Sequence, residues 1–329
     1  MWLHRVQEEK IHNDLLKKMV FIVGPRQVGK TWLAKKIMER YGHSLYLNYD
    51  SIEDRTMMET FRKTGDSLAG RFFVHHLLPL SLSELKDDAI TDKVDRLIER
   101  SGFPEPFLVE TREEAARWRK LYTDSLVRED IINFETVTDI KALYNVFEIL
   151  RRSVGSPVSF SNIARDVGIS PVTVKKYISV LESLYIIFSI RTFSAKIKRS
   201  ILKESKIYFY DTGLVIGDQG VVFENFVALS LLKDTELRND MQGANNGLYY
   251  LRTKEGKEAD FVLVNSMNEP QKMIEVKYSD ILVSKNLLYF KNKYGIPAVQ
   301  LVKNMSKVGF IVDGVSIFRA EEFLTDINN

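Results

Sequence analysis

Residues 19–31, with the sequence MVFIVGPRQVGKT, constrain the fold of this chain more than any other stretch. An apolar run from Val20 to Val23 leads into the pattern G-x-x-x-x-G-K-[ST], and the helix-forming segment WLAKKIMER follows. A buried strand, a glycine loop and a helix N-terminus in this order make a cradle for phosphate groups, because backbone amides and the helix dipole both favour negative charge. The sequence therefore predicts an α/β core with a nucleotide-phosphate site after its first strand.

The expected phosphate site comprises the loop and the start of the helix, that is Gly24, Pro25, Arg26, Gln27, Val28, Gly29, Lys30 and Thr31. The glycines let the backbone wrap the phosphates, the Lys30 ammonium reaches the β- and γ-phosphates, and the Thr31 hydroxyl suits Mg²⁺. The cofactors that these residues predict are ATP and Mg²⁺.

The acid that normally accompanies such a loop is not found. P-loop ATPases carry a second apolar strand ending in Asp or Asp-Glu, which holds the water shell of Mg²⁺. The segment LYLNYD at 45–50 comes so soon after the first helix that we interpret it as the next strand of the same sheet. The segment IYFYD at 207–211 lies beyond a second domain, and we interpret it as a plain strand ending in a polar turn.

Length and composition favour a globular protein of two or three domains, with 329 residues, 45% of them hydrophobic and 28% charged. The absence of cysteine excludes disulfides and thiolate zinc sites, and the five scattered histidines lack the paired spacing of a metal site. No apolar run approaches the ~20 residues of a membrane span, and the first residues lack signal-peptide features, so we expect a cytoplasmic protein without membrane contact. A net charge of +3 does not by itself indicate a nucleic-acid partner.

The passage from Gly65 to Arg71, followed by PLSLSE at 79–84, resembles the "S-L-x-G-R … P-L-S-x-x-E" passage of a prokaryotic AAA-type P-loop ATPase family. GPRQVGKT is also typical of that family, whose members join the ATPase to a C-terminal domain of unknown function. The resemblance implies ATPase activity and suggests Arg71 as a phosphate-sensing arginine. The alternative for Arg71 is a solvated arginine at a strand edge.

The resemblance is interrupted in the middle of the ATPase. Family members place the acidic strand and a polar sensor strand between the segments that resemble LYLNYD and GDSLAGR, and here only residues 51–64 separate these two. The chain thus resembles a member with an internal deletion, and its sheet would lack the middle strands. ATP hydrolysis is therefore in doubt although the phosphate loop is present.

Residues 87–150 are predicted to be helical. The turn G-F-P-E at 102–105 matches the helical lid region of the family. Apolar and small residues at helical spacing predict a core-facing stripe made by Trp118, Leu121, Tyr122, Ser125 and Leu126.

Residues 142–200 predict a winged helix. A short helix at 162–167, a turn at Gly168, and a second helix begun by the Ser170 cap and Pro171 form a helix-turn-helix pattern. The exposed residues of the second helix, where a DNA reader places its contacts, would be Thr173, Lys175 and Lys176. No arginine or asparagine occupies its early exposed positions, so non-specific DNA contact or a structural role is favoured over specific recognition.

A basic stretch at 196–206 follows, with Lys196, Lys198, Arg199, Lys203 and Lys206. We interpret it as a wing that touches DNA phosphates. A winged helix that binds only protein is the alternative.

The last part of the chain carries a second constellation. Asp260 lies in EADFVLV, and Glu275 and Lys277 lie on one face of the following strand, IEVK. This order is the PD-(D/E)XK nuclease pattern, in which carboxylates hold Mg²⁺ and the lysine orients or activates the attacking water. The predicted catalytic residues are Asp260, Glu275 and Lys277, and the predicted metal ligands are Glu224, Asp260 and Glu275, with Glu224 as the additional acid on the first helix. A structural cross-strand Glu–Lys pair is the alternative.

The sequence therefore predicts an α/β fold in four parts. These are a shortened P-loop AAA-type domain at 1–86, a helical lid at 87–141, a winged helix at 142–200 and a nuclease-like α/β domain at 201–329. The predicted function is ATP binding by a prokaryotic AAA-type protein, with DNA and a second copy of the chain as candidate partners. The alternatives are a Mg²⁺-dependent nuclease and a DNA- or protein-binding regulator without enzymatic activity, so the sequence leaves open whether the chain is an enzyme.

Overall fold

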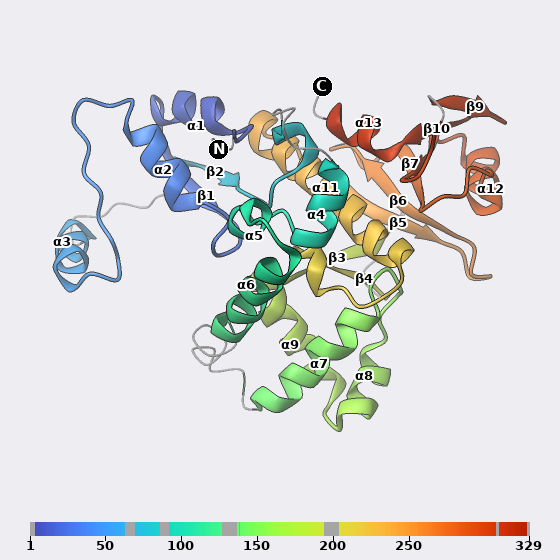
Figure 1. Ribbon diagram of the computed structural model, residues 1–329, viewed down its shortest axis with the longest axis horizontal. Helices are drawn as coiled ribbons and strands as arrows, with labels where there is room; N and C mark the ends of the chain where they lie inside the picture. The colour runs from blue at the N-terminus through green and yellow to red at the C-terminus, as the bar shows by residue number, and fades with distance from the viewer. Residues whose placement is uncertain are drawn as a thin grey trace.

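The computed structural model describes residues 4–62, 70–85, 92–126, 137, 139–193, 204–306 and 309–327. Its described strands form a two-stranded sheet near the N-terminus and an eight-stranded sheet in the C-terminal half. Helices α6 to α9 extend below both sheets in Figure 1. The fold is mixed α/β, as the sequence predicts.

The N-terminal part contains α1 (Glu8–Leu15), β1 (Met19–Val23), α2 (Lys30–Met38), α3 (Ile52–Arg62), β2 (Phe72–His76) and the short helix η1 (Leu82–Glu84). β1 and β2 run parallel, with Met19 opposite Phe72 and Val23 opposite His76. The predicted first strand and the helix after its loop both form. The expected burial of the strand is wrong, since Phe21 is 42% exposed. Within the described residues, β2 is the only strand paired with β1, so the other edge of β1 is left uncovered by a strand.

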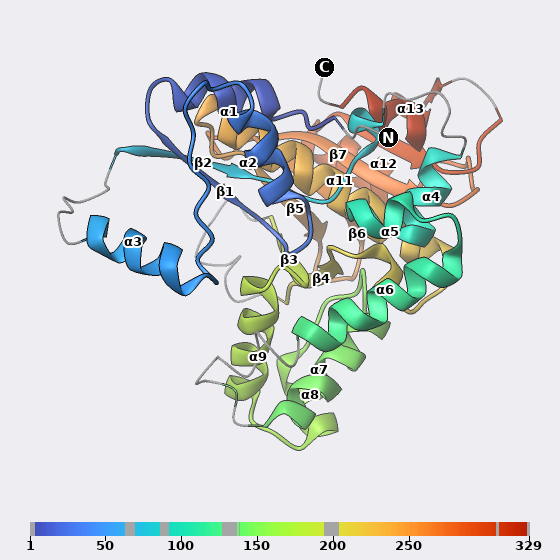
Figure 2. The same cartoon turned by 60° about the vertical axis from the view of Figure 1, so that its left-hand side comes forward.

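The predicted strand LYLNYD does not form. Residues 45–50 are loop and turn, and Leu45 is 71% exposed. A strand needs a neighbour to pair its backbone amides and carbonyls, and no described strand lies beside this segment to supply them. Helix α3, which follows the segment, lies apart from β1 and β2 (Figure 2).

The middle of the chain forms α4 (Lys93–Arg100), α5 (Pro104–Leu108) and α6 (Arg112–Ser125). On α6, Trp118 and Tyr122 stack with ring centroids 4.8 Å apart, and Phe103 packs against both rings. Leu126 is buried as well. Leu121 is 70% exposed, so the prediction that it faces the core is wrong. The core-facing stripe therefore follows the i, i+4 spacing of Trp118, Tyr122 and Leu126.

Helices α7 (Ile140–Arg152), α8 (Phe160–Val167) and α9 (Pro171–Ser183) are followed by the antiparallel strands β3 (Ile187–Thr192) and β4 (Lys206–Phe209). The expected local signals are present, because Gly168 ends α8 in the left-handed conformation and the Ser170 hydroxyl accepts a hydrogen bond from the Thr173 amide at 3.0 Å. The helix-turn-helix geometry lies where the sequence predicts it.

The large sheet has the strand order β4-β3-β5-β6-β7-β8-β10-β9. Its further strands are β5 (Gly247–Arg252), β6 (Glu258–Val264), β7 (Pro270–Lys277), β8 (Ala298–Val302), β9 (Phe310–Val312) and β10 (Val315–Arg319). The short helix η4 (Thr212–Leu214) and helices α11 (Gln219–Gln242), α12 (Lys285–Tyr294) and α13 (Ala320–Thr325) complete the described elements of this part. Because β3 pairs in parallel with β5, the hairpin after the helix-turn-helix belongs to the same sheet as the C-terminal strands.

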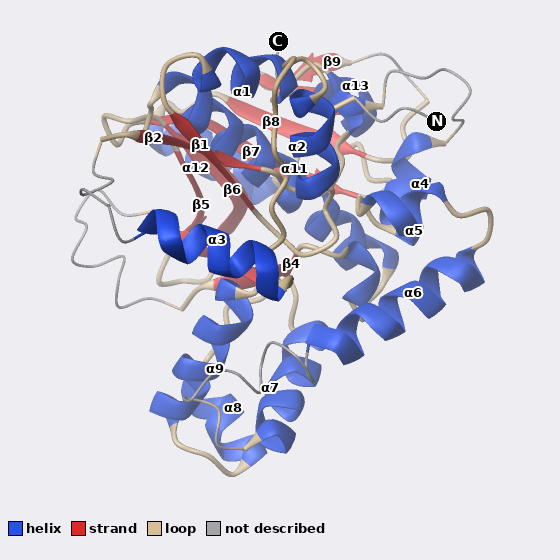
Figure 3. Cartoon of the chain, turned by 90° about the vertical axis from the view of Figure 1, so that its left-hand side faces the viewer, coloured by secondary structure: helices blue, strands red, loops and turns tan. Residues whose placement is uncertain are grey.

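Both faces of the large sheet are covered by helices, as Figure 3 shows. Alternate residues of β6 belong to different apolar clusters: Phe261 packs in the cluster that includes α11, and Val262 in the cluster that includes Leu287 and Phe290 of α12. This alternation is expected of a strand covered on both sides. None of the described helices is long and apolar enough to cross a membrane.

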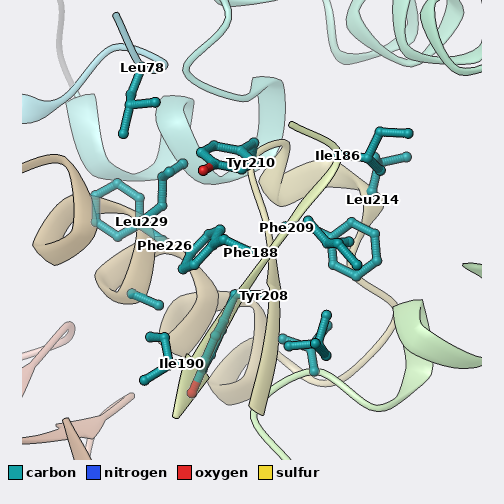
Figure 4. Packing of buried hydrophobic residues seen from close by; sticks show 14 of the residues in the cluster. Leu78, Ile186, Phe188, Ile190, Tyr208, Phe209, Tyr210, Leu214, Phe226 and Leu229 are labelled. Atoms are coloured by element: carbon teal, nitrogen blue, oxygen red, sulfur yellow. The ribbon is translucent and has the colours of Figure 1, made fainter. Parts of the chain in front are cut away.

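An aromatic core joins the two halves of the chain. Phe188 of β3 packs against Tyr208 of β4 and Tyr210 with ring centroids 5.1–5.7 Å apart. Figure 4 shows these rings beside Phe226 of α11 and Leu78, which follows β2. The N-terminal part of the chain and the C-terminal half therefore share one hydrophobic core.

Candidate functional site

The loop between β1 and α2 turns through three residues with positive φ. Gly24 has φ 142°, Gln27 has φ 58°, and Gly29, with φ 98°, caps α2 immediately before Lys30. A Cβ on Gly24 would lie 2.2 Å from the Leu77 carbonyl oxygen, so this position requires glycine for conformation and for space. Residues 24–29 thus form a loop that leads directly into α2 at Lys30 and Thr31.

Lys30 is held inside this loop. Its ammonium donates to the carbonyl oxygens of Gly24 at 2.7 Å and Pro25 at 2.5 Å. Burial and the nearby Arg26 guanidinium lower the pKa of Lys30 below its ordinary value. A phosphate at the loop would give the ammonium an anionic partner in place of neutral carbonyls.

Neighbouring elements fix the loop from outside. The Arg5 guanidinium donates to the carbonyl oxygens of Val28 at 2.8 Å and Leu78 at 2.9 Å, and the Tyr122 hydroxyl donates to the Arg26 carbonyl at 3.5 Å. Val28 is fully buried. The helical region after β2 therefore packs against the phosphate loop.

Arg71 does not lie at the phosphate loop of its own chain. Its carbonyl oxygen accepts a hydrogen bond from the Met19 amide at 3.3 Å, at the start of the parallel strand pair. The phosphate loop begins after the other end of β1, about 13 Å away at the usual rise per strand residue. The geometry fits an arginine at a strand edge.

The second constellation assembles at the end of the β6–β7 pair. Phe261 lies opposite Ile274, which brings Asp260 and Glu275 side by side on neighbouring strands. The Val276 amide donates to Asp260 Oδ2 at 2.8 Å, and the Lys277 ammonium donates to Glu275 Oε1 at 2.9 Å. The structure therefore brings together the three residues that the sequence predicts as catalytic.

This site has an excess of buried negative charge. Burial raises the pKa of Asp260 well above its ordinary value, and the charges of Glu275 and Glu224 raise it further. Glu275 is 5% exposed, and its Oε2 atom has no hydrogen-bond partner among the described residues. A buried carboxylate oxygen without a partner fits a hard cation, since Mg²⁺ and Mn²⁺ prefer oxygen ligands.

Glu224, at the N-terminal part of α11, faces a lysine. Glu224 Oε1 accepts from the Tyr208 hydroxyl at 2.8 Å and from the Lys206 ammonium at 3.3 Å. The same ammonium lies 2.6 Å from Glu258 Oε1 and 3.9 Å from Asp260 Oδ1. We call Glu224, Glu258, Asp260 and Glu275 the acidic cluster.

The prediction for Lys206 is wrong. The basic stretch predicts an exposed wing at this position, whereas the Lys206 side chain is 1% exposed and lies among carboxylates. The reason is tertiary, because β4 pairs with β3 at one edge of the large sheet and Lys206 there contacts Glu224 and Glu258. The other basic residues of the stretch, Lys196, Lys198, Arg199 and Lys203, lie outside the described residues.

Three residues of this site were missed by the sequence analysis: Lys206 as a site residue, Tyr208 and Glu258. A signal for two of them was available. Glu258 precedes Asp260 by two residues on one strand, and Tyr208 follows Lys206 by two, so the period of a strand places each pair on one face. Only the fold shows that the residues of β4 and Glu258 of β6 belong to one site.

The exposed face of α9 partly matches its prediction. Lys175 and Lys176 are exposed, whereas Thr173 is half-buried and its hydroxyl lies 2.8 Å from that of Ser170. Two of the three predicted residues are therefore exposed on α9.

One further group of acids lies between the two halves of the chain. Among the described residues, only His76, Glu236 and Asp240 bring three His, Asp or Glu ligand atoms within 4.8 Å of one another. The ligand atoms of the predicted set, Glu224, Asp260 and Glu275, are therefore spaced more widely than this. His76 Nδ1 lies 3.0 Å from Asp240 Oδ1, and the His76 amide donates to Asp240 Oδ2 at 2.6 Å. These direct hydrogen bonds, which raise the pKa of His76, indicate an ion pair that joins β2 to α11.

A buried ionic network connects the phosphate loop to α11. Glu84 accepts from the Arg5 guanidinium at 3.0 Å and from the Lys233 ammonium, which also donates to the Pro79 carbonyl at 2.7 Å. Burial lowers the pKa of Lys233 to about 8, and Glu84 opposes this shift. Since Arg5 also holds the Val28 carbonyl, these three residues, which we call the Glu84 network, link the loop to the C-terminal half.

Comparison with known families identifies the classes of domain to which this chain is similar. Residues 16–64 match a family described as "AAA domain", residues 91–219 match "Domain of unknown function (DUF8612)", and residues 219–322 match "Domain of unknown function (DUF4143)". The N-terminal match is thus to an AAA domain, and the two matches that follow are to domains of unknown function.

The individual relatives are uncharacterized proteins of bacteria and an archaeon. One of Mycobacterium tuberculosis is 25% identical over 206 residues, covering 60% of this chain and 45% of the relative. One of Methanocaldococcus jannaschii is 25% identical over 242 residues, covering 66% and 52%, and one of Haemophilus influenzae is 26% identical over 186 residues, covering 50% and 46%. The chain spans about half the length of the curated relatives it matches. No solved structure matches it.

Proposed function

We propose that this chain binds Mg-ATP through residues 24–31 and does not hydrolyse it efficiently. The observation that carries the proposal is the loop geometry, in which three positive-φ residues lead into the N-terminus of α2 at Lys30. The backbone of the loop would surround the phosphates, Lys30 would contact the β- and γ-phosphates, and Thr31 would hold Mg²⁺. When bound, Mg²⁺ bridges phosphate oxygens and neutralises part of their charge.

The proposal separates binding from hydrolysis because, among the residues that the structure describes, no acid from a strand next to β1 lies at the loop. Within the described part of the chain, β1 pairs only with β2, and β2 ends in His75 and His76 rather than in an acid. A P-loop ATPase positions its attacking water and the water shell of Mg²⁺ with an acid from a neighbouring strand. Binding without efficient turnover is the result that this shortened sheet supports.

Replacing Lys30 by Ala is expected to abolish Mg-ATP binding, because the variant loses the cation that contacts the phosphates. Titration calorimetry should show micromolar binding by the unaltered chain and none by Lys30→Ala. Lys35→Ala, which removes an exposed lysine of the same helix, is the matched control and should bind normally. Equal binding by Lys30→Ala, or no binding by the unaltered chain, would contradict the proposal.

A second candidate function, phosphodiester cleavage, is favoured by the orphaned Glu275 oxygen. Asp260 and Glu275 would hold a divalent cation, and Lys277, anchored on Glu275, would orient or activate the attacking water. The cation would polarise the phosphodiester and lower the pKa of water. The exposed lysines 175 and 176 of α9 would contact the nucleic-acid backbone without reading sequence.

If this candidate is right, the chain should nick supercoiled DNA or cleave single-stranded DNA or RNA in the presence of Mg²⁺. Lys277→Ala should lower the rate by about 100-fold or more, the usual size of a lost proton-transfer or water-orienting group. Lys30→Ala and Lys272→Ala, the second altering a lysine elsewhere on β7, should leave it unchanged. No cleavage of any of these substrates, or cleavage that survives Lys277→Ala, would exclude this function.

A further inference from the structure

The charges around the acidic cluster are not balanced. Its four carboxylates face the ammonium groups of Lys206 and Lys277 and the guanidinium of Arg252, which lies 3.3 Å from Glu258 Oε2. One negative charge therefore remains when all of these groups are ionised. A buried excess of this size is unfavourable without a counter-ion.

The two lysines serve different parts of the cluster. Lys206 contacts Glu258 and Glu224 most closely, whereas Lys277 contacts Glu275 Oε1. The atom left over is Glu275 Oε2, which is buried and has no hydrogen-bond partner in the described structure. The uncompensated charge thus lies at Asp260 and Glu275, on the side of the cluster away from the closest contacts of Lys206.

Lys206 is held firmly in place. It begins β4, pairs with Ile190 of β3 and forms an isolated bridge with Pro157. Its ammonium also lies 5.4 Å from the centre of the Tyr250 ring, and the side chain is 1% exposed. Its ammonium lies 2.6 Å from Glu258 Oε1 and 3.3 Å from Glu224 Oε1, contacts that favour the charged form. A charged group this deeply buried cannot move into water without rearrangement of the strand.

We propose that the Lys206 ammonium is a built-in cation of the acidic cluster, which occupies the place that a second metal ion would take in a two-metal site. The cluster accordingly binds one divalent cation, at Asp260 and Glu275. The inference deepens the second candidate function, since it specifies the metal content of that site, but metal binding can be measured whether or not the chain cleaves nucleic acid.

The experiment is a titration of the nucleotide-free chain with Mn²⁺, followed by electron paramagnetic resonance and calorimetry. The unaltered chain should bind one ion at this site, and Glu275→Gln should lose it. Lys206→Met should bind a second ion, or the first at least about tenfold more tightly, because it gains the negative charge that Lys206 balances. Lys206→Arg, which keeps the positive charge, should behave like the unaltered chain.

Lys272→Met is the matched control, since this lysine lies on the same strand as Glu275 but 5.3 Å from the centre of the Phe323 ring, outside the acidic cluster, and the variant should bind one ion as the unaltered chain does. If Lys206→Met unfolds without metal, Mn²⁺ should restore its circular dichroism spectrum and raise its melting temperature more than that of the unaltered chain. No ion or two ions in the unaltered chain, or a Lys206→Met variant with unchanged binding and no rescue by Mn²⁺, would overturn the inference. One bound ion without cleavage would exclude the nuclease function and leave the assignment of Lys206 intact.

Discussion

Replacing Glu84 by Gln is expected to lower the free energy of unfolding by about 3–5 kcal/mol, the usual effect of breaking a buried ion pair by removing one partner. The Glu84 side chain is fully buried, and its loss would leave Arg5 and Lys233 buried without a counter-charge. Denaturation in urea followed by circular dichroism measures this change. Because Arg5 also holds the Val28 carbonyl, the affinity for Mg-ATP should fall in the same variant.

The control for this prediction is Glu9→Gln. Glu9 is exposed and contacts Arg40 at the surface, where an ion pair contributes little because water and salt screen it. This variant should unfold at nearly the same urea concentration as the unaltered chain. A similar loss of stability in both variants would show that the Glu84 network does not hold the two halves together.

Replacing Gly24 by Ala is expected to abolish Mg-ATP binding and to destabilise the N-terminal half by about 2–6 kcal/mol. Backbone strain at φ 142° and the overlap of the new Cβ with the Leu77 carbonyl oxygen, at 2.2 Å, both contribute to this range. To relieve the overlap, the loop after β1 would have to move away from Leu77, which follows β2. This movement would strain the hydrogen bond that the Leu77 amide donates to the Val23 carbonyl at 2.8 Å. Calorimetric titration with Mg-ATP and thermal unfolding give the two readouts.

Gly70→Ala separates strain from crowding. Gly70 also has a positive φ, of 73°, but a Cβ there would meet no atom within 4 Å. Its replacement should cost about 1–2 kcal/mol through the left-handed conformation alone and leave nucleotide binding intact. Equal effects of the two substitutions would mean that the close approach of Gly24 to Leu77 is unimportant.

Local signals predicted the elements that depend on neighbouring residues in the chain. The first strand and the helix at Lys30, the Gly168 turn, and the Ser170 cap with Pro171 lie where the sequence places them. Each of these depends on hydrogen bonds or conformational preferences within a few residues. The pairing of Asp260 with Glu275 was also predictable, since a hairpin and the period of a strand bring them together.

The errors concern properties that depend on what lies beside an element. The segment at 45–50 has the composition of a strand, but without a described neighbour strand it forms a loop. β1 forms yet is poorly buried for the same reason. Leu121 has helical spacing suited to the core and is nevertheless exposed, because the packing of α6 uses the face of Trp118 and Tyr122.

By itself, the sequence determined the position of the loop before α2, of helices α8 and α9 with the Gly168 turn between them, and of the strands that carry Asp260, Glu275 and Lys277, since each depends on spacing within a short segment. Only the tertiary structure decided that Lys206 is a buried member of the acidic cluster and that Glu84 joins Arg5 to Lys233. The physical reason is that burial and charge pairing bring together groups from elements far apart in the chain. For Glu84 and Lys233 the separation is 149 residues, and no local pattern records such a contact.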